Sequence, residues 1–264
     1  MTIENKSNFW SIPNFQCYEF EKKQTNYCIV IPILNEGDRI KNQLILMQKI
    51  SKKIDVIIAD GNSEDGSTNF NFLKSNNVRT LLIKKDQGKL SAQLRMAYSY
   101  ALKEKYEGII TIDGNGKDDV TAIPNFIEEL KKGYDYIQGS RFINGGKAIN
   151  TPLIRLLAIK FIHAPMISII AKKKFTDTTN GFRAYSAKYL LDTKVQPFRK
   201  VFDSYELLAY LSVKASLLNL NTKEIPVTRS YPYNQKIPTK INGIKGYFKL
   251  LKILYHLLLD KYSP

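Results

Sequence analysis

The chain has 264 residues, 44% of them hydrophobic, which is enough to form the core of one large domain and excludes a disordered protein. Its 40 Lys and Arg residues against 24 Asp and Glu give a formal net charge of +16. Such a charge implies an anionic partner, namely nucleic acid, an anionic membrane surface or a phosphate-bearing substrate. Cys17 and Cys28 have neither metal-binding nor redox spacing, so we expect both to be buried hydrophobes in a reducing compartment.

Membrane and export signals are weak in this sequence. The first ten residues, MTIENKSNFW, contain no apolar segment typical of a signal peptide. No run of about 18 uncharged apolar residues occurs, so we expect no segment to span a bilayer. Both observations predict a cytoplasmic protein.

The chain then alternates between apolar runs and segments of helical spacing. Residues 1–26 are predicted to form a surface extension before a domain over 27–228. Strands are predicted within 28–37, 54–67, 78–84, 108–114 and 134–142, and helices within 39–50, 70–76, 89–106 and 122–133. This alternation predicts an α/β fold with a Rossmann-like, mostly parallel sheet flanked by helices.

Three polar loops follow predicted strands: PILNEG at 32–37, ADGNSEDGS at 59–67 and DGNGKDD at 113–119. Ligands of open α/β sheets bind beyond the carboxyl ends of the strands. Acidic and amide side chains in three successive loops of so basic a chain therefore indicate one shared site.

The second half contains two amphipathic segments. Residues 150–175 are apolar but carry Arg155, Lys160, His163 and Pro165, which fits a buried helical hairpin or a segment lying on a membrane. Residues 229–264 are predicted to form a basic loop and a C-terminal amphipathic helix. Lysines line one face of that helix, so it either docks on the core or lies in an anionic membrane interface.

Six motifs occur in the order expected of family 2 glycosyltransferases. They are IVIPILNEG, VIIADGNSEDGS, ITIDGNG, QGSRF, DTTNGFRAYS and EIPVTR. Over about residues 27–242 the chain resembles the polyprenyl-phosphate sugar transferases of that family, whose type is dolichol-phosphate mannosyltransferase. The resemblance implies a GT-A fold, a nucleotide-diphospho-sugar donor and transfer with inversion.

The resemblance implies that Pro32, Glu36 and Asp60 bind the nucleoside of the donor. An ionised carboxylate is a pure acceptor and suits ribose hydroxyls and base N–H groups. The sequence departs from the family pattern at Leu34, where an aromatic residue is frequent, and at Gly61, in place of a second carboxylate.

The family's Asp-x-Asp motif, which holds a divalent cation on the diphosphate, aligns with Asp113 and Asn115. These two residues are predicted to bind Mg²⁺ or Mn²⁺, because Mg²⁺ needs only one or two carboxylates beside phosphates and water. Lys117 cannot bind a cation and is expected to pair with phosphate directly. Asp118 and Asp119 either restore metal ligands or cap the following helix.

The resemblance also assigns the acceptor side. Arg141 and Arg155 match two arginines that hold the acceptor phosphate, and Lys240 matches a basic residue that folds over the donor diphosphate. A lipid phosphate is already ionised, so it needs positioning and charge neutralisation instead of a general base.

The DTTNGFRAYS motif places Asp177 and Arg183 beside the reacting groups. Arg183 is expected to bind acceptor. If the acceptor is a hydroxyl, a carboxylate must take its proton, and Asp177 is the first candidate. Glu206 is a weaker candidate on the acceptor side.

The sequence thus predicts a cytoplasmic enzyme, peripherally associated with the cytoplasmic membrane, that transfers a sugar to a polyprenyl phosphate. One alternative is transfer to a sugar hydroxyl of a lipid-linked glycan in capsule or surface-polysaccharide assembly. Another is a silent scaffold that binds nucleotide sugar without turnover. A nucleic-acid-binding protein is disfavoured, because it would not carry three acidic strand-end loops.

Overall fold

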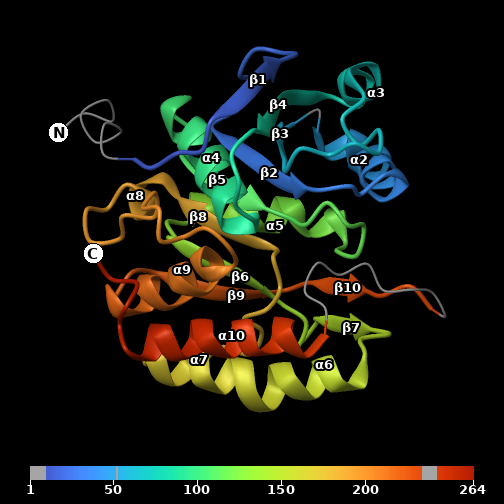
Figure 1. Cartoon of the computed structure of the whole chain (residues 1–264). Coiled ribbons are helices and arrows are strands. Elements are labelled where there is room, and N and C mark those ends of the chain that lie inside the picture. The colour runs from blue at the N-terminus through green and yellow to red at the C-terminus, as the bar shows by residue number, and fades with distance from the viewer. Residues whose placement is uncertain (1–9, 52, 234–242) are drawn as a thin grey trace.

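The computed structural model describes residues 10–51, 53–233 and 243–264. In this part of the chain, eight strands form one sheet in the order β1-β4-β3-β2-β5-β8-β6-β9 (Figure 1). Their bounds are β1 Phe15–Glu19, β2 Tyr27–Ile33, β3 Asp55–Asp60, β4 Val78–Lys84, β5 Gly108–Thr111, β6 Tyr136–Ser140, β8 Arg183–Ser186 and β9 Thr222–Pro226. Only β1 and β8 run antiparallel to their neighbours. The predicted α/β fold with a mostly parallel sheet is confirmed.

Alternate residues of the central strands face two separate cores, as the twofold period of a strand requires. On β2, Cys28 and Val30 face one core, and Ile29 and Ile31 face the other. The first core contains residues of α4 (Leu90–Lys103), α9 (Glu206–Leu217) and the short α8 (Ala187–Leu190). The second contains residues of α2 (Asp38–Ser51), α3 (Phe70–Ser75) and α5 (Ile123–Lys131). Both faces of the sheet are therefore covered.

The N-terminal segment is more ordered than the sequence indicated. Residues 15–19 form β1, which pairs antiparallel with β4 at one edge of the sheet. Cys28 is buried as expected, but the same expectation for Cys17 is wrong, since Cys17 lies exposed on this edge strand.

Residues 153–171 form one continuous helix, so the hairpin is wrong, and the other alternative, a segment lying on a membrane, stays a prediction. It comprises α6 (Leu153–Ala158), a π-helical turn η2 (Ile159–His163) and α7 (Ala164–Ala171). Among the described residues, this helix of 19 residues is long and apolar enough to cross a membrane, by length and composition only. Its two charges, Arg155 and Lys160, interrupt the apolar run without ending the helix, and the expectation that no segment spans a bilayer stays a prediction.

The C-terminal helix α10 (Gly243–Leu258) packs beside α7 and α9 and lies along the same side of the molecule as α6 and α7 (Figure 1). Ile253, Leu254 and Leu257 are buried in the core, so the helix docks on the domain. Phe248 and Tyr255 nevertheless stay 66% and 55% exposed. The helix thus has both a core-facing and an exposed apolar side.

The topology brings distant segments to one edge of the sheet. Strands β2, β3, β5, β6 and β9 point the same way, so their carboxyl ends meet there. Because β8 is antiparallel, the residues before it reach the same edge. A two-stranded sheet of β7 (Lys147–Ile149) and β10 (Thr228–Ser230) adds the residues that follow β9.

Candidate active site

Asp113 lies two residues beyond the end of β5 and is partly accessible, with a side chain 25% exposed. Its Oδ2 accepts from Arg229 Nη2 at 3.0 Å and from Asn115 Nδ2 at 3.3 Å. The 177–182 loop presses against it from the other side. A Cβ at Gly181 would lie 2.3 Å from Asp113 Oδ1, so only glycine permits this approach.

The rest of the 113–119 loop is held by its own polar groups. Asn115 Oδ1 accepts from the backbone N–H of Lys117 at 3.3 Å, which turns its amide nitrogen toward Asp113. Asp119 accepts from the backbone N–H of Thr121 and caps the helical turn η1 (Val120–Ala122). Asp118 is buried and pairs with Arg229. Of the two roles left open for Asp118 and Asp119, metal ligand or helix cap, Asp119 takes the role of helix cap.

The site fits a divalent cation only if other ligands come with it. The described part of the chain contains no group of three His, Cys, Asp or Glu side chains that could hold a metal. Asp113 offers one carboxylate, and the Asn115 amide would add an oxygen after a flip. Such a pair suits a cation that takes its other ligands from phosphates and water.

Three cationic side chains surround the ring of Tyr231. Lys117 Nζ lies 5.1 Å from the ring centroid, and the guanidinium carbons of Arg155 and Arg229 lie at 5.6 and 5.9 Å. The Tyr231 hydroxyl accepts from Arg155 Nη1 at 3.0 Å. Burial alone would raise the pKa of Tyr231, but the charges of Arg229 and Arg155 outweigh it and lower that pKa. We call Lys117, Arg155, Arg229 and Tyr231 the cation cluster.

Electrostatics in the cation cluster favour an incoming anion. Burial, and next the charge of Arg229, lower the pKa of Lys117. A bound phosphate would offset that repulsion and stabilise the charged ammonium. The cluster lies next to Asp113 because Arg229 belongs to both groups.

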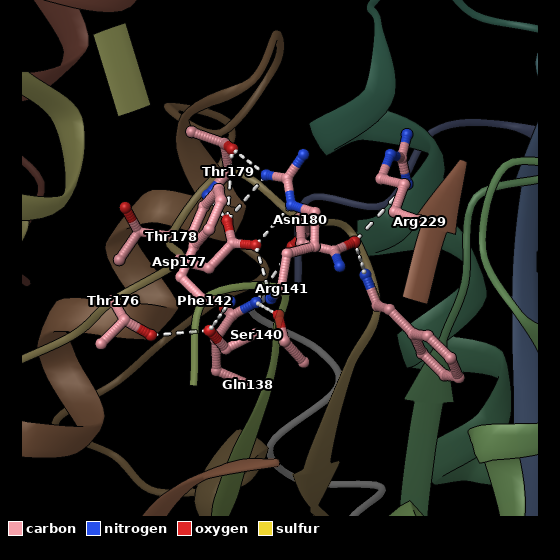
Figure 2. A network of polar contacts seen from close by, with 12 residues as sticks. Gln138, Ser140, Arg141, Phe142, Thr176, Asp177, Thr178, Thr179, Asn180 and Arg229 are labelled. Carbon is pink, nitrogen blue, oxygen red and sulfur yellow. Dashed lines mark hydrogen bonds and ion pairs between the residues drawn. The ribbon is translucent and has the colours of Figure 1, made fainter. Parts of the chain in front are cut away.

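Arg141, which directly follows β6, forms a buried ion pair with Asp177, which lies in the loop before β8 (Figure 2). Arg141 Nη2 also donates to the Thr179 hydroxyl at 2.9 Å. Burial would raise the pKa of Asp177, but hydrogen bonds and charge from Arg141 outweigh it and lower that pKa. A carboxylate held ionised in this way is a weak proton acceptor, so the geometry gives no support to Asp177 as a general base.

Arg183 is fully buried, and its donors serve the fold. They bond the carbonyls of Thr178, Asn180 and Leu208 and the Ser212 hydroxyl. The acceptor-binding role expected for Arg183 thus has no support, because its guanidinium is inaccessible.

The residues expected to bind the nucleoside lie at the ends of β2 and β3. Pro32 is buried on β2, beyond the last pairing with β5 at Val30. Asp60 is buried and accepts from the backbone N–H groups of Asn62 and Ser63, each at 2.9 Å. Burial raises the pKa of Asp60, although the Ser63 hydrogen bonds oppose the rise. Glu36 pairs with Arg39 at 2.8 Å. The structure thus brings all three to one end of the sheet.

The remaining candidates lie elsewhere. Lys240 falls outside the described residues. Glu206 begins α9 and accepts from the Ser204 backbone N–H at 2.7 Å, as a residue at a helix start does. It is therefore engaged in the fold.

Sequence reasoning missed Arg229, Tyr231 and Asn180 as site residues. Asn180 Oδ1 accepts from the Phe182 N–H at 3.0 Å and lies 3.5 Å from Arg229 Nη1 (Figure 2). Its Nδ2 is buried and has no hydrogen-bond partner among the described residues, so it can donate to a bound ligand. The available signals were the DTTNGFRAYS motif, which contains Asn180, and the EIPVTR motif, which contains Arg229 and ends two residues before Tyr231.

Comparison with known proteins agrees with this geometry. The model of Glycosyl transferase family 2 matches residues 28–193. The chain is 22% identical over 75% of its length to the undecaprenyl-phosphate mannosyltransferase of Micrococcus luteus, covering 81% of that protein. It is 24% identical over 87% of its length to the dolichol-phosphate mannosyltransferase of Pyrococcus furiosus, covering 63% of that protein.

Among solved structures, glucosyl-3-phosphoglycerate synthase of Mycobacterium tuberculosis, crystallised with Mn²⁺, UDP and phosphoglyceric acid, has a similar fold. The TM-score is 0.62 at 11% identity, over 98% of this chain and 81% of that one. The architecture is that of a GT-A glycosyltransferase. The chain belongs to glycosyl transferase family 2.

Proposed function

We propose that the enzyme transfers a sugar, with inversion, from a nucleotide-diphospho-sugar to a polyprenyl phosphate at the cytoplasmic face of a membrane. The named relatives act on polyprenyl phosphates. The solved structure with UDP and Mn²⁺ supports a nucleotide donor and a divalent cation.

The observation that carries this proposal is the position of Arg155. It lies on α6, within the helix 153–171, which has one buried side and one side of exposed apolar side chains. Its guanidinium nevertheless bonds Tyr231 in the cation cluster beside Asp113. An acceptor with an apolar chain and an anionic head could therefore place its chain on the helix and its phosphate at the cluster.

The exposed apolar surface fits such an acceptor and the membrane that holds it. Ile154, Phe161 and Ile169 are 73%, 72% and 72% exposed on the helix 153–171. Phe248 and Tyr255 extend this surface on α10, which packs against α7. Exposed lysines, including Lys160 and Lys252, border it and suit anionic headgroups. We call the exposed apolar residues of both helices the lipid-facing surface.

In the proposed reaction, an acceptor phosphate oxygen attacks the anomeric carbon of the sugar from the side opposite the diphosphate. The bond from that carbon to the diphosphate breaks, and the nucleoside diphosphate leaves with the electron pair. Lys117 and Arg155 would hold and neutralise phosphate, and no proton need be removed from an ionised nucleophile. A divalent cation held by Asp113 with Asn115 would supply further charge neutralisation on the leaving diphosphate.

The test is turnover by the purified protein with UDP-, GDP- and CDP-sugars, in vesicles with and without polyprenyl phosphate. We expect nucleoside diphosphate release that requires polyprenyl phosphate and falls about 100-fold in Asp113→Ala. Transfer only to a glycan hydroxyl would overturn the proposed acceptor. Donor binding without any turnover would instead support the alternative of a silent scaffold that binds nucleotide sugar.

A further inference from the structure

Arg229 holds two carboxylates of the 113–119 loop at once. Its Nη2 donates to Asp113 Oδ2 at 3.0 Å, and its Nη1 donates to Asp118 Oδ2. The backbones of Asp118 and Arg229 also form an isolated antiparallel bridge, which fixes the two residues side by side. One guanidinium thus serves both a buried and an accessible carboxylate.

The two carboxylates differ in how much they depend on the ion pair with Arg229. The Asp118 side chain is 0% exposed, and its Oδ1 has no hydrogen-bond partner among the described residues. Arg229 is therefore the main compensation for a buried charge, and separating this pair would be costly. Asp113 is 25% exposed, so a ligand can reach it while Arg229 remains on Asp118.

We propose that Arg229 is a positioning residue that neutralises Asp113 until the donor diphosphate arrives, and so makes cation binding depend on the donor. A divalent cation bound to Asp113 alone would lie near a fixed guanidinium, and like charges repel. A diphosphate adds negative charge that attracts both the cation and Arg229. Donor and cation then strengthen each other's binding by the same factor. This inference rests on the proposed nucleotide donor and is independent of the acceptor.

The test measures binding of Mn²⁺ to the purified full-length protein by electron paramagnetic resonance of the free ion, with and without UDP. The main variant is Asp118→Asn combined with Arg229→Gln, which removes one charge of each sign and leaves Asp113 without its guanidinium. Arg229→Lys is the second variant, because one ammonium cannot bridge both carboxylates and stays on Asp118. Asp113→Asn controls for the site, and thermal unfolding checks the fold.

We expect UDP to tighten Mn²⁺ binding by wild type about tenfold or more. Without UDP, the double variant should bind Mn²⁺ about tenfold more tightly than wild type, and Arg229→Lys about threefold more tightly. The gain from UDP should shrink by the same factors. A purely structural Arg229 would alter unfolding but not these ratios.

Equal Mn²⁺ affinities of wild type and both variants without UDP would overturn the proposal, as would the absence of Mn²⁺ binding in all conditions. If none of UDP, GDP and CDP binds the protein, the proposed donor fails; if one of them binds and leaves Mn²⁺ binding unchanged, the coupling of donor and cation is overturned. The comparison without nucleotide then still decides whether Arg229 restrains cation binding at Asp113.

Discussion

Arg141 and Asp177 form a two-pronged ion pair in the protein interior. Arg141 Nε donates to Asp177 Oδ2 at 2.6 Å, and Nη2 donates to Oδ1 at 2.9 Å. The two side chains are 1% and 0% exposed. The pair joins the end of β6 to the loop before β8, so it fixes the segment that contains Asn180 and Gly181.

Breaking this pair should destabilise the protein. Arg141→Gln leaves a buried carboxylate without compensation, and we expect it to cost about 3 kcal/mol in the free energy of unfolding. Urea denaturation measures the cost. The double variant Arg141→Gln with Asp177→Asn should recover most of the loss. Activity that stays absent in that stable double variant would assign the pair a role beyond stability, and a single variant as stable as wild type would contradict the prediction.

Tyr231 should act through both its hydroxyl and its ring. Tyr231→Phe removes the acceptor of the Arg155 hydrogen bond but keeps the ring, so we expect the KM for polyprenyl phosphate to rise about tenfold. Tyr231→Leu also removes the ring beside Lys117, and kcat should fall as well. Tyr18→Phe, on β1 at the other edge of the sheet, is the matched control. Equal kinetics for both Tyr231 variants and wild type would refute the cation cluster's role.

The lipid-facing surface should bind anionic vesicles through its apolar side chains. Phe161→Ser removes a ring that is 72% exposed, and we expect vesicle affinity to fall about 30-fold in cosedimentation, since burying such a ring contributes about 2 kcal/mol. Leu46→Ser on α2 is matched in exposure, at 71%, and should change nothing. Equal losses in both variants would show that the attachment is unspecific.

His163 should make stability depend on pH. It lies in η2, its Nδ1 is 2.7 Å from the Thr178 hydroxyl, and burial, with Arg183 nearby, lowers its pKa from 6.5 to about 4. Between these values the unfolded chain binds more protons, so stability is full above pH 6.5 and declines as the pH falls toward 4. We expect His163→Gln to remove on the order of 1 kcal/mol of the decline between pH 6.5 and 5, measured by urea denaturation. An unchanged pH profile in the variant would contradict this.

The position of the expected donor-binding residues at one edge of the sheet could be predicted from the sequence, because it depends on local pattern. Asp60 and Asp113 directly follow apolar runs, and parallel strands carry their end residues to one edge. The cap at Asp119 follows from residue type and position alone. Such inferences need only strand period and turn chemistry.

The ion pairs of the site could not be predicted from the sequence, because they join residues that are far apart in the chain. Arg141 and Asp177 are 36 positions apart, and Arg229 reaches Asp113 across 116. Strand β9, which leads to Arg229, has the mixed burial of a sheet edge and no continuous apolar run. The sequence left segment 150–175 open between a helical hairpin and a membrane-lying segment, and it did not predict the π-helical turn η2 that precedes Pro165 within the continuous helix 153–171.

The placement of β9 has a consequence for how this enzyme can diverge. The residues predicted to bind the nucleoside lie at the ends of β2 and β3 in the middle of the sheet. Each of these strands has neighbouring strands on both sides, which constrain substitutions there. Tyr231, which accepts a hydrogen bond from Arg155 of the proposed acceptor site, follows β9, which has a neighbour on one side only. Changes after β9 can therefore accumulate without repacking the central strands. Acceptor preference can shift while the donor nucleotide stays the same.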